Sequence, residues 1–156
     1  MDRIEKVRNI VDEVILSIAD VEERKRAYIH IYGVSQACAL LAMKRNVNVE
    51  LAVVAGMLHD IYLCTNKEDG RNHACKGAER SRDILDSLNL FSEEEITLIC
   101  TAIHNHSDKV AVHNSFDELL KDADVLQHVL HKPLQDIEQR ERKRFVSMEE
   151  EFDLER

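Results

Sequence analysis

Residues 51–58 (LAVVAGML) contain no charged or polar side chain, and they constrain the fold more than any other stretch of the sequence. A helix that is apolar on every face must be buried on all sides, so this stretch predicts a central helix over about residues 48–59. It ends in His59 and Asp60, two side chains that are costly to bury without partners. Both can reach a common point only beyond the helix end, and a divalent cation there would keep the carboxylate ionised. Taken alone, the dipeptide more often marks a helix-end histidine capped by its neighbour.

The rest of the sequence also favours helices. The chain has 156 residues with 44% apolar and 4% aromatic composition, four glycines and one proline, which leaves few turns for a β-rich fold. We therefore expect an all-α fold class: one compact domain over residues 1–156 with about six to seven helices. Besides the central helix, apolar periodicity and capping signals predict six helices. They lie at about 3–18, 22–45, 73–88, from the Ser92 capping box to His106, from a similar signal at Ser115 through Leu130, and at 134–152 after Pro133.

The predicted C-terminal helix, about residues 134–152, is highly charged and carries one narrow apolar stripe. Phe145, Met148 and Phe152 form this stripe. We expect it to dock on the domain, and the alternative is that it pairs with a second copy in a homodimer.

Charge and composition exclude several classes of function. A net charge of −9, with no basic block interleaved with aromatic residues, argues against a nucleic-acid polymer as partner. No apolar run approaches the roughly 18 residues of a membrane span, and the N-terminus lacks a signal-peptide core, so we expect a cytoplasmic protein with no membrane partner. The cysteines form no CxxC pair and are expected to be reduced packing residues; they are Cys38, Cys64, Cys75 and Cys100.

Two further polar residues lie on apolar stripes, like the His59–Asp60 pair. His30 faces the predicted core from the second helix, and Asp124 interrupts an apolar run in DADVL. This order of histidine, His-Asp and aspartate on separate helices resembles the HD superfamily of metal-dependent phosphohydrolases. The matching segments span about residues 28–128 and read HIYGVSQACALLA, AGMLHDI, HACKGAE, AIHNHSDK and DADVL.

The resemblance implies a metal centre. His30, His59, Asp60 and Asp124 fall on the motif positions that hold one divalent ion, and mixed histidine and carboxylate ligands suit Mn, Fe, Co, Ni or Zn. Asp122 is the competing carboxylate. Because it lies about 200° around the helix from Asp124, the two cannot face the same ion.

Two more histidines match the motifs HxxxGAE and AIxxH of two-metal relatives. His73 begins one predicted helix and His106 ends another, so the resemblance implies a second ion that shares Asp60. The alternative is a single ion, with both histidines around it or in contact with phosphate.

The expected activity is hydrolysis of a nucleotide or another small phosphoester by metal-activated water, with Asp60 as its central catalytic residue. Many relatives continue the His-Asp pair with Ile-Gly-Lys, whereas Ile61-Tyr62-Leu63 stand here, so phosphate contact falls to Lys67, Arg71 or Lys109. The missing lysine also keeps open a non-catalytic metal- or nucleotide-binding sensor. Two roles stay undecided: His128, four residues after Asp124, is either a partner of the site or a residue that lines the helix, and the general acid or base is Glu68, Asp69, Asp108 or none of these.

Overall fold

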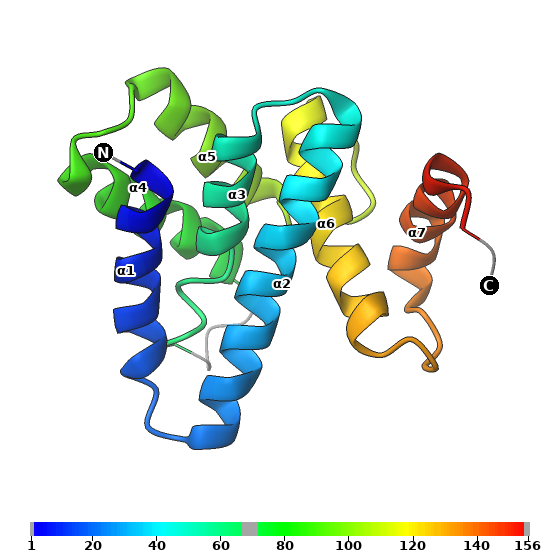
Figure 1. Cartoon of the computed structure of the whole chain (residues 1–156), viewed down its shortest axis with the longest axis horizontal. Helices are drawn as coiled ribbons and strands as arrows, with labels where there is room; N and C mark the ends of the chain where they lie inside the picture. The colour runs from blue at the N-terminus through cyan, green and yellow to red at the C-terminus, as the bar shows by residue number, and fades with distance from the viewer. Residues whose placement is uncertain (1, 67–71, 155–156) are drawn as a thin grey trace.

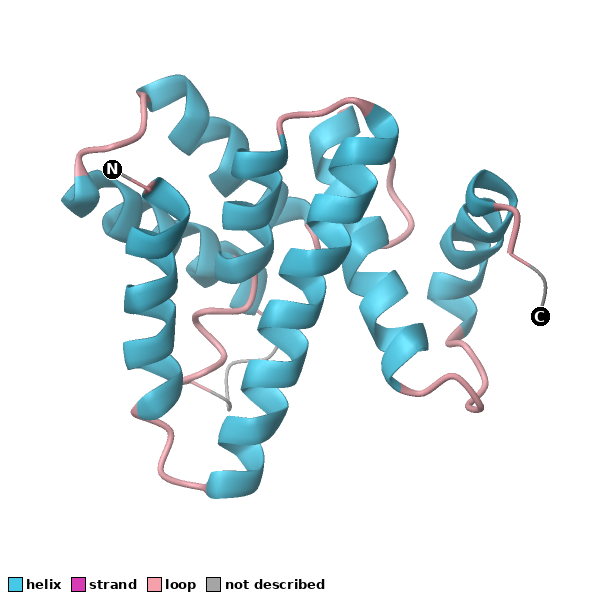
Figure 2. Cartoon of the chain, viewed as in Figure 1, coloured by secondary structure: helices cyan, strands magenta, loops and turns pink. Residues whose placement is uncertain are grey.

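The computed structural model describes residues 2–66 and 72–154, which form seven α-helices and no strand. The all-α prediction is confirmed (Figures 1 and 2). The helices are α1 (Arg3–Leu16), α2 (Val21–Arg45), α3 (Val49–Leu58), α4 (His73–Leu88), α5 (Glu93–Asn105), α6 (Ser115–His131) and α7 (Gln139–Phe152).

Helix α3 lies at the centre of the domain, as its apolar sequence predicts. Seven of its ten residues are buried, and it packs on α1, α2, α5 and α6. Helix α2 runs the length of the molecule between α1 and α6, α4 pairs with α5, and α7 lies outermost beside α6 (Figure 1). None of the helices in the described part of the chain has the length and apolarity needed to cross a membrane.

A tight turn joins α2 to α3. Asn46 ends α2 in the left-handed conformation, with φ 54° and ψ 45°, a region that asparagine tolerates better than most residues. Asn48 then caps α3 by accepting a hydrogen bond from the backbone nitrogen of Leu51 at 3.1 Å. The two helices approach so closely that a Cβ on Gly56 would lie 2.7 Å from Cα of Ser35, so only glycine fits there.

Two helix starts differ from those expected. Asn114 caps α6 in place of Ser115, because its Oδ1 accepts from the backbone nitrogens of Phe116 and Asp117 at 3.0 Å each. Helix α7 begins at Gln139, five residues later than the predicted 134. Pro133 disfavours helical backbone at the residue before it, and a hydrogen bond from the Gln135 nitrogen to the Lys132 carbonyl (3.0 Å) closes a turn there.

Helix α7 docks on the domain through the predicted stripe, since Phe145 and Met148 are buried and Phe152 packs at the edge of the core. Arg144 reinforces the contact, since it pairs with Glu118 at 2.7 Å and with Asp122 at 3.0 Å. The homodimer stays a prediction. All four cysteines are free, and three are buried as expected, whereas Cys75 is exposed.

Candidate metal centre

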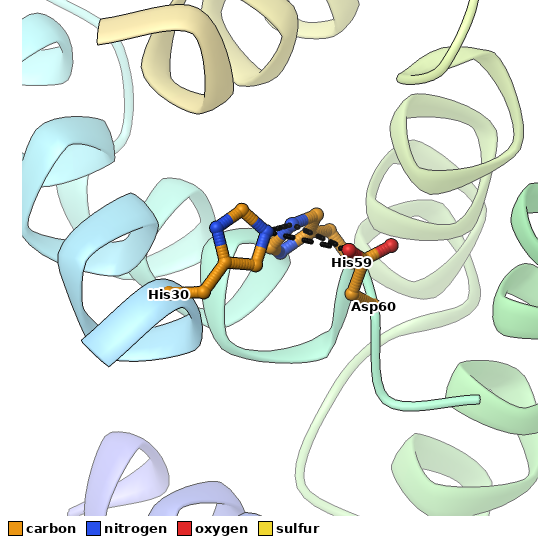
Figure 3. A group of neighbouring side chains, drawn as sticks. All are labelled: His30, His59 and Asp60. Atoms are coloured by element: carbon orange, nitrogen blue, oxygen red, sulfur yellow. Dashed lines mark hydrogen bonds and ion pairs between the residues drawn. The ribbon is translucent and has the colours of Figure 1, made fainter. Parts of the chain in front are cut away.

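Three of the expected ligands meet where α2 passes the end of α3. His30 comes from α2, and His59 and Asp60 follow the last residue of α3. Nε2 of His30 lies 3.0 Å from Nε2 of His59 and 3.3 Å from Oδ2 of Asp60 (Figure 3). His59 is fully buried. The side chains thus converge on one point beyond the helix end.

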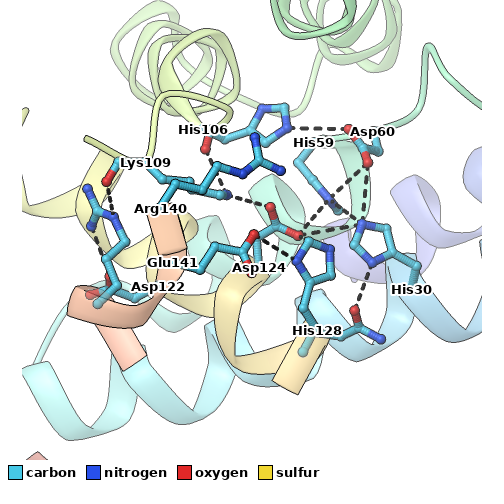
Figure 4. A network of polar contacts seen from close by, with 12 residues as sticks. His30, His59, Asp60, His106, Lys109, Asp122, Asp124, His128, Arg140 and Glu141 are labelled. Atoms are coloured by element: carbon cyan, nitrogen blue, oxygen red, sulfur yellow. Dashed lines mark hydrogen bonds and ion pairs between the residues drawn. The ribbon is translucent and has the colours of Figure 1, made fainter. Parts of the chain in front are cut away.

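Asp124 of α6 completes this group. Its Oδ1 lies 3.6 Å from Nε2 of His30 and 3.9 Å from Nε2 of His59 (Figure 4). We call the group formed by His30, His59, Asp124 and Oδ2 of Asp60 the α2/α6 side of the centre. It is the arrangement expected from the sequence.

The other oxygen of Asp60 faces a second pair of histidines. Oδ1 lies 3.3 Å from Nε2 of His106, at the end of α5, and 3.8 Å from Nε2 of His73, at the start of α4. We call this group the α4/α5 side. Asp60 therefore directs one oxygen to each side, which is the placement that a carboxylate shared by two ions requires.

The histidines are oriented by their outer nitrogens. Nδ1 of His30 bonds Oε1 of Gln127 at 2.8 Å, while Nδ1 of His59 and of His106 bond the carbonyls of Gly56 and Ile103 at 2.8 and 2.6 Å. An acceptor at Nδ1 fixes the proton there and leaves Nε2 for the centre, as is usual for histidines that bind metals.

Two observations show that a cation fits these residues. Nε2 atoms 3.0 Å apart, as in His30 and His59, need a proton or a cation between them. Oδ1 of Asp60 and Oδ1 of Asp124 are buried and accept no hydrogen bond within the described residues. Buried carboxylate oxygens without donors are costly, and a divalent ion removes that cost. His/Asp sets on both sides are compact enough to hold an ion.

The electrostatics keep the carboxylates charged. Burial works against ionisation of Asp60, yet His59, His106 and His30 outweigh it and hold its pKa well below the usual value. Burial likewise opposes ionisation of Asp124, and Lys109 leads the groups that lower its pKa.

The two facing histidines differ in charge. Burial lowers the pKa of His59 to about 4. Burial also disfavours charge on His30, but the hydrogen bond to Asp60 and the charge of Asp124 prevail and raise its pKa to about 9. Asp60 and Asp124 thus favour positive charge on His30, whereas burial disfavours it on His59.

Lys109 lies inside the centre rather than on its open face. It is buried, and its Nζ bonds Oδ2 of Asp124 at 2.5 Å and the His106 carbonyl at 2.8 Å. These two bonds use two of the three ammonium hydrogens, and the phosphate contact expected of Lys109 stays a prediction. Asp122 faces away from the centre and pairs with Arg45 at 2.8 Å, so the choice of Asp124 over Asp122 agrees with the geometry.

Of the other candidate residues, some lie outside the described residues and some have a structural role. Lys67 and Arg71, with Glu68 and Asp69, lie outside the described residues. Oδ1 of Asp108 accepts from two backbone nitrogens of its own loop at 3.1 and 3.0 Å, which makes it a turn residue. Sequence reasoning missed Gln127 and Glu141 entirely and left His128 undecided. The spacing of His128, four residues after Asp124, is the signal that pointed to it.

A cleft of about 390 Å³ opens beside the centre. His30 and His128 form part of its wall, between the first half of α2 and the segment that joins α6 to α7. Its apolar wall includes Ile29, Val129 and Ile137.

Comparison with known proteins identifies the class. Residues 27–128, more than half of the chain, match the family model of the HD domain, so the chain belongs to the HD-domain family. HD domains bind divalent metal ions, and the His/Asp groups described above can hold one.

A crystal structure at 1.45 Å resolution of a predicted HD superfamily hydrolase from an uncultured Thermotogales bacterium has a similar fold. The TM-score is 0.65 at 20% sequence identity, over 96% of this chain and 88% of that one. Comparison with curated proteins gives no match.

Proposed function

We propose that this chain is a divalent-metal-dependent phosphohydrolase that acts on a nucleotide or another small phosphoester. One observation carries the proposal: Asp60 directs its two oxygens to two separate histidine pairs, and one of these oxygens is buried without a hydrogen-bond donor among the described residues. A shared carboxylate between two histidine pairs fits a site that binds divalent metal ions for phosphoester cleavage. The name of the Thermotogales relative, a predicted hydrolase, supports the same class of reaction.

The chain's own residues prepare the reaction. A bound divalent ion supplies a water of lowered pKa and shields charge on phosphoryl oxygens. Asp60 and Asp124 stay ionised, since their pKa values are held low, and Lys109 fixes Asp124 through its second oxygen. Gln127 holds the ring of His30. Such restraint lowers the reorganisation that the site needs before it reacts.

The cleft supports a phosphorylated small molecule as substrate. Arg26, His131 and Lys132 line it, and their side chains have no ion-pair partner in the part of the chain that the structure describes. An acidic protein that binds an anion needs local cations of this kind. Apolar residues of the same wall, such as Ile29 and Val129, offer contact to a base or another uncharged group.

The test is a panel of nucleotides and small phosphoesters, assayed for phosphate release. The chain is first stripped with a chelator, and Mn, Co, Ni, Mg or Zn is then added singly. We expect release with at least one substrate and metal, lost in His59→Ala and in Asp124→Ala. Asp83→Ala, at an exposed position of α4, serves as the matched control and keeps the activity. A panel that stays silent with every metal contradicts the proposal.

A non-catalytic sensor is the second candidate, because one observation favours it. Leu63 stands at the third position after the His-Asp pair, where many relatives have a lysine, and the ammonium of Lys109 bonds Asp124. A sensor would bind metal, and nucleotide in a metal-dependent way, without phosphate release. Calorimetry on the same panel separates the two candidates.

A further inference from the structure

His128 lies against the centre although it belongs to none of the matching motifs. It is on α6, one turn after Asp124, and its Nε2 is 3.4 Å from Oδ1 of Asp124. Its ring lies beside that of His30, with centroids 5.3 Å apart and an angle of 15° between the planes (Figure 4). His128 thus presents the same nitrogen to the same place as the expected ligands.

A buried glutamate orients this histidine. Glu141 is only 3% exposed, and its Oε1 lies 3.2 Å from Nδ1 of His128. A carboxylate at Nδ1 fixes the proton on that nitrogen and leaves Nε2 for the centre. His30, His59 and His106 show the same pattern, each with an acceptor at Nδ1. Glu141 comes from α7, which lies outside the residues that match the family model.

Three imidazole nitrogens therefore surround one carboxylate oxygen. Nε2 of His30, His59 and His128 lies 3.6, 3.9 and 3.4 Å from Oδ1 of Asp124, an oxygen that is buried and has no hydrogen-bond donor in the described residues. The ligand atoms of His30, Asp124 and His128 all lie within 4.8 Å of one another, a set compact enough for one ion.

We propose that His128 is an additional ligand of the metal on the α2/α6 side, held in position by Glu141 of α7. The inference rests on the proposed function in one respect, that this side holds a divalent ion. The side chain of His128 is 41% exposed and lines the cleft, so it is the ligand on the open face of the centre. A fifth protein ligand exceeds the four of a usual tetrahedral zinc site and favours Mn, Fe, Co or Ni.

The experiment is a Co²⁺ titration of the metal-free full chain, followed by calorimetry and by visible absorption of the bound cobalt. Absorption reports on the ligands, so it distinguishes a lost ligand from a loosened structure. We expect His128→Gln to weaken cobalt binding by about 10–100-fold and to change the spectrum at saturation. Glu141→Met removes only the group that orients the ring, so it should weaken binding by about tenfold and keep the spectrum.

Matched controls are His104→Gln on an exposed face of α5 and Glu150→Gln on an exposed face of α7, and both should bind as wild type does. Wild-type affinity and spectrum in His128→Gln would overturn the inference, even if phosphate release fell. If Glu141→Met did not fold, His128→Gln would still decide. A wild-type chain that takes up no cobalt would instead remove both the inference and the metal centre beneath it.

Discussion

The two sides of the centre share Asp60 but are built to different degrees. The α2/α6 side gathers two histidines and a second carboxylate, Asp124, around Oδ2 of Asp60. Among the described residues, the α4/α5 side offers His73 and His106 around Oδ1, and Asp60 is the carboxylate of that set. Because charge and ligand number both raise affinity for a divalent ion, we expect the α2/α6 side to fill first. The difference indicates that one aspartate can lie between two sets of ligands of unequal size, of which the larger is expected to bind a divalent ion more tightly.

The largest effect is expected from Asp60→Ala, which removes the group common to both sides. It should abolish metal binding on each, because one of its carboxylate oxygens faces His30 and the other faces His106. Elemental analysis after dialysis measures the bound metal, and Asp83→Ala is the control. Wild-type stoichiometry in Asp60→Ala would show that the ligands were wrongly assigned.

The next largest effect concerns metal stoichiometry, which distinguishes the two sides of the centre. Titration of metal-free wild type with Mn²⁺ should give two equivalents in two classes of affinity. The double variant His73→Ala/His106→Ala should lose the weaker class alone, since it leaves the α2/α6 side complete. If wild type saturates at one equivalent and the double variant behaves identically, the chain holds a single ion and the shared-aspartate comparison fails.

Lys109 bonds a residue of each side, and Lys109→Met tests that connection. Removing one partner of a buried ion pair costs about 3–5 kcal/mol of folding free energy, so the metal-free variant should unfold at much lower denaturant concentration. Saturating metal should restore part of the loss, because the ion then neutralises Asp124. Equal unfolding midpoints for the variant and wild type would show that the ammonium does not support Asp124.

The smallest effect concerns the residue that holds the ring of His30. Gln127→Leu removes the acceptor at Nδ1 and should weaken metal binding on the α2/α6 side by about tenfold. Gly33→Ala should cause a smaller loss by the same route, because the new Cβ would lie 2.7 Å from Cγ of Gln127 and displace it. A double variant of Gly33→Ala with Gln127→Ala, which has no Cγ to displace, should bind like Gln127→Ala alone. An additional loss in the double variant would mean that Gly33→Ala acts through another contact.

The helices could be predicted because their signals are local. Apolar periodicity, the uniformly apolar stretch of α3 and capping signals located α1 to α6, and the capping box of Ser92 with Glu95 is formed as expected. The start of α7 was placed five residues early, since the turn after Pro133 depends on where the chain must reverse to reach α6.

The residues of the candidate site also divide into those with a local signal in the sequence and those without one. His30, His59, Asp60 and Asp124 interrupt or end apolar stripes, so their position against the core was visible in the sequence. Gln127 and Glu141 gave no such signal, because each acquires its role from a partner on another helix. Glu141 looks like any other charge in a highly charged helix until α7 packs against α6 and covers it.

The turn at Asn46 acts on the centre from a distance. His30 lies 16 residues before Asn46 and His59 lies 13 residues after it, so the α2 and α3 arms that carry the two rings extend about 24 and 20 Å from the same bend. The turn thus contributes to the alignment of the antiparallel helices α2 and α3, and with it to how His30 and His59 meet. One residue inserted within α3 would turn the tip of that helix by about 100° and shift it by about 1.5 Å if the start of the helix stayed in place. The alignment of the metal-binding rings thus depends both on the turn at Asn46, which touches none of them, and on the number of residues in α3 that follow it.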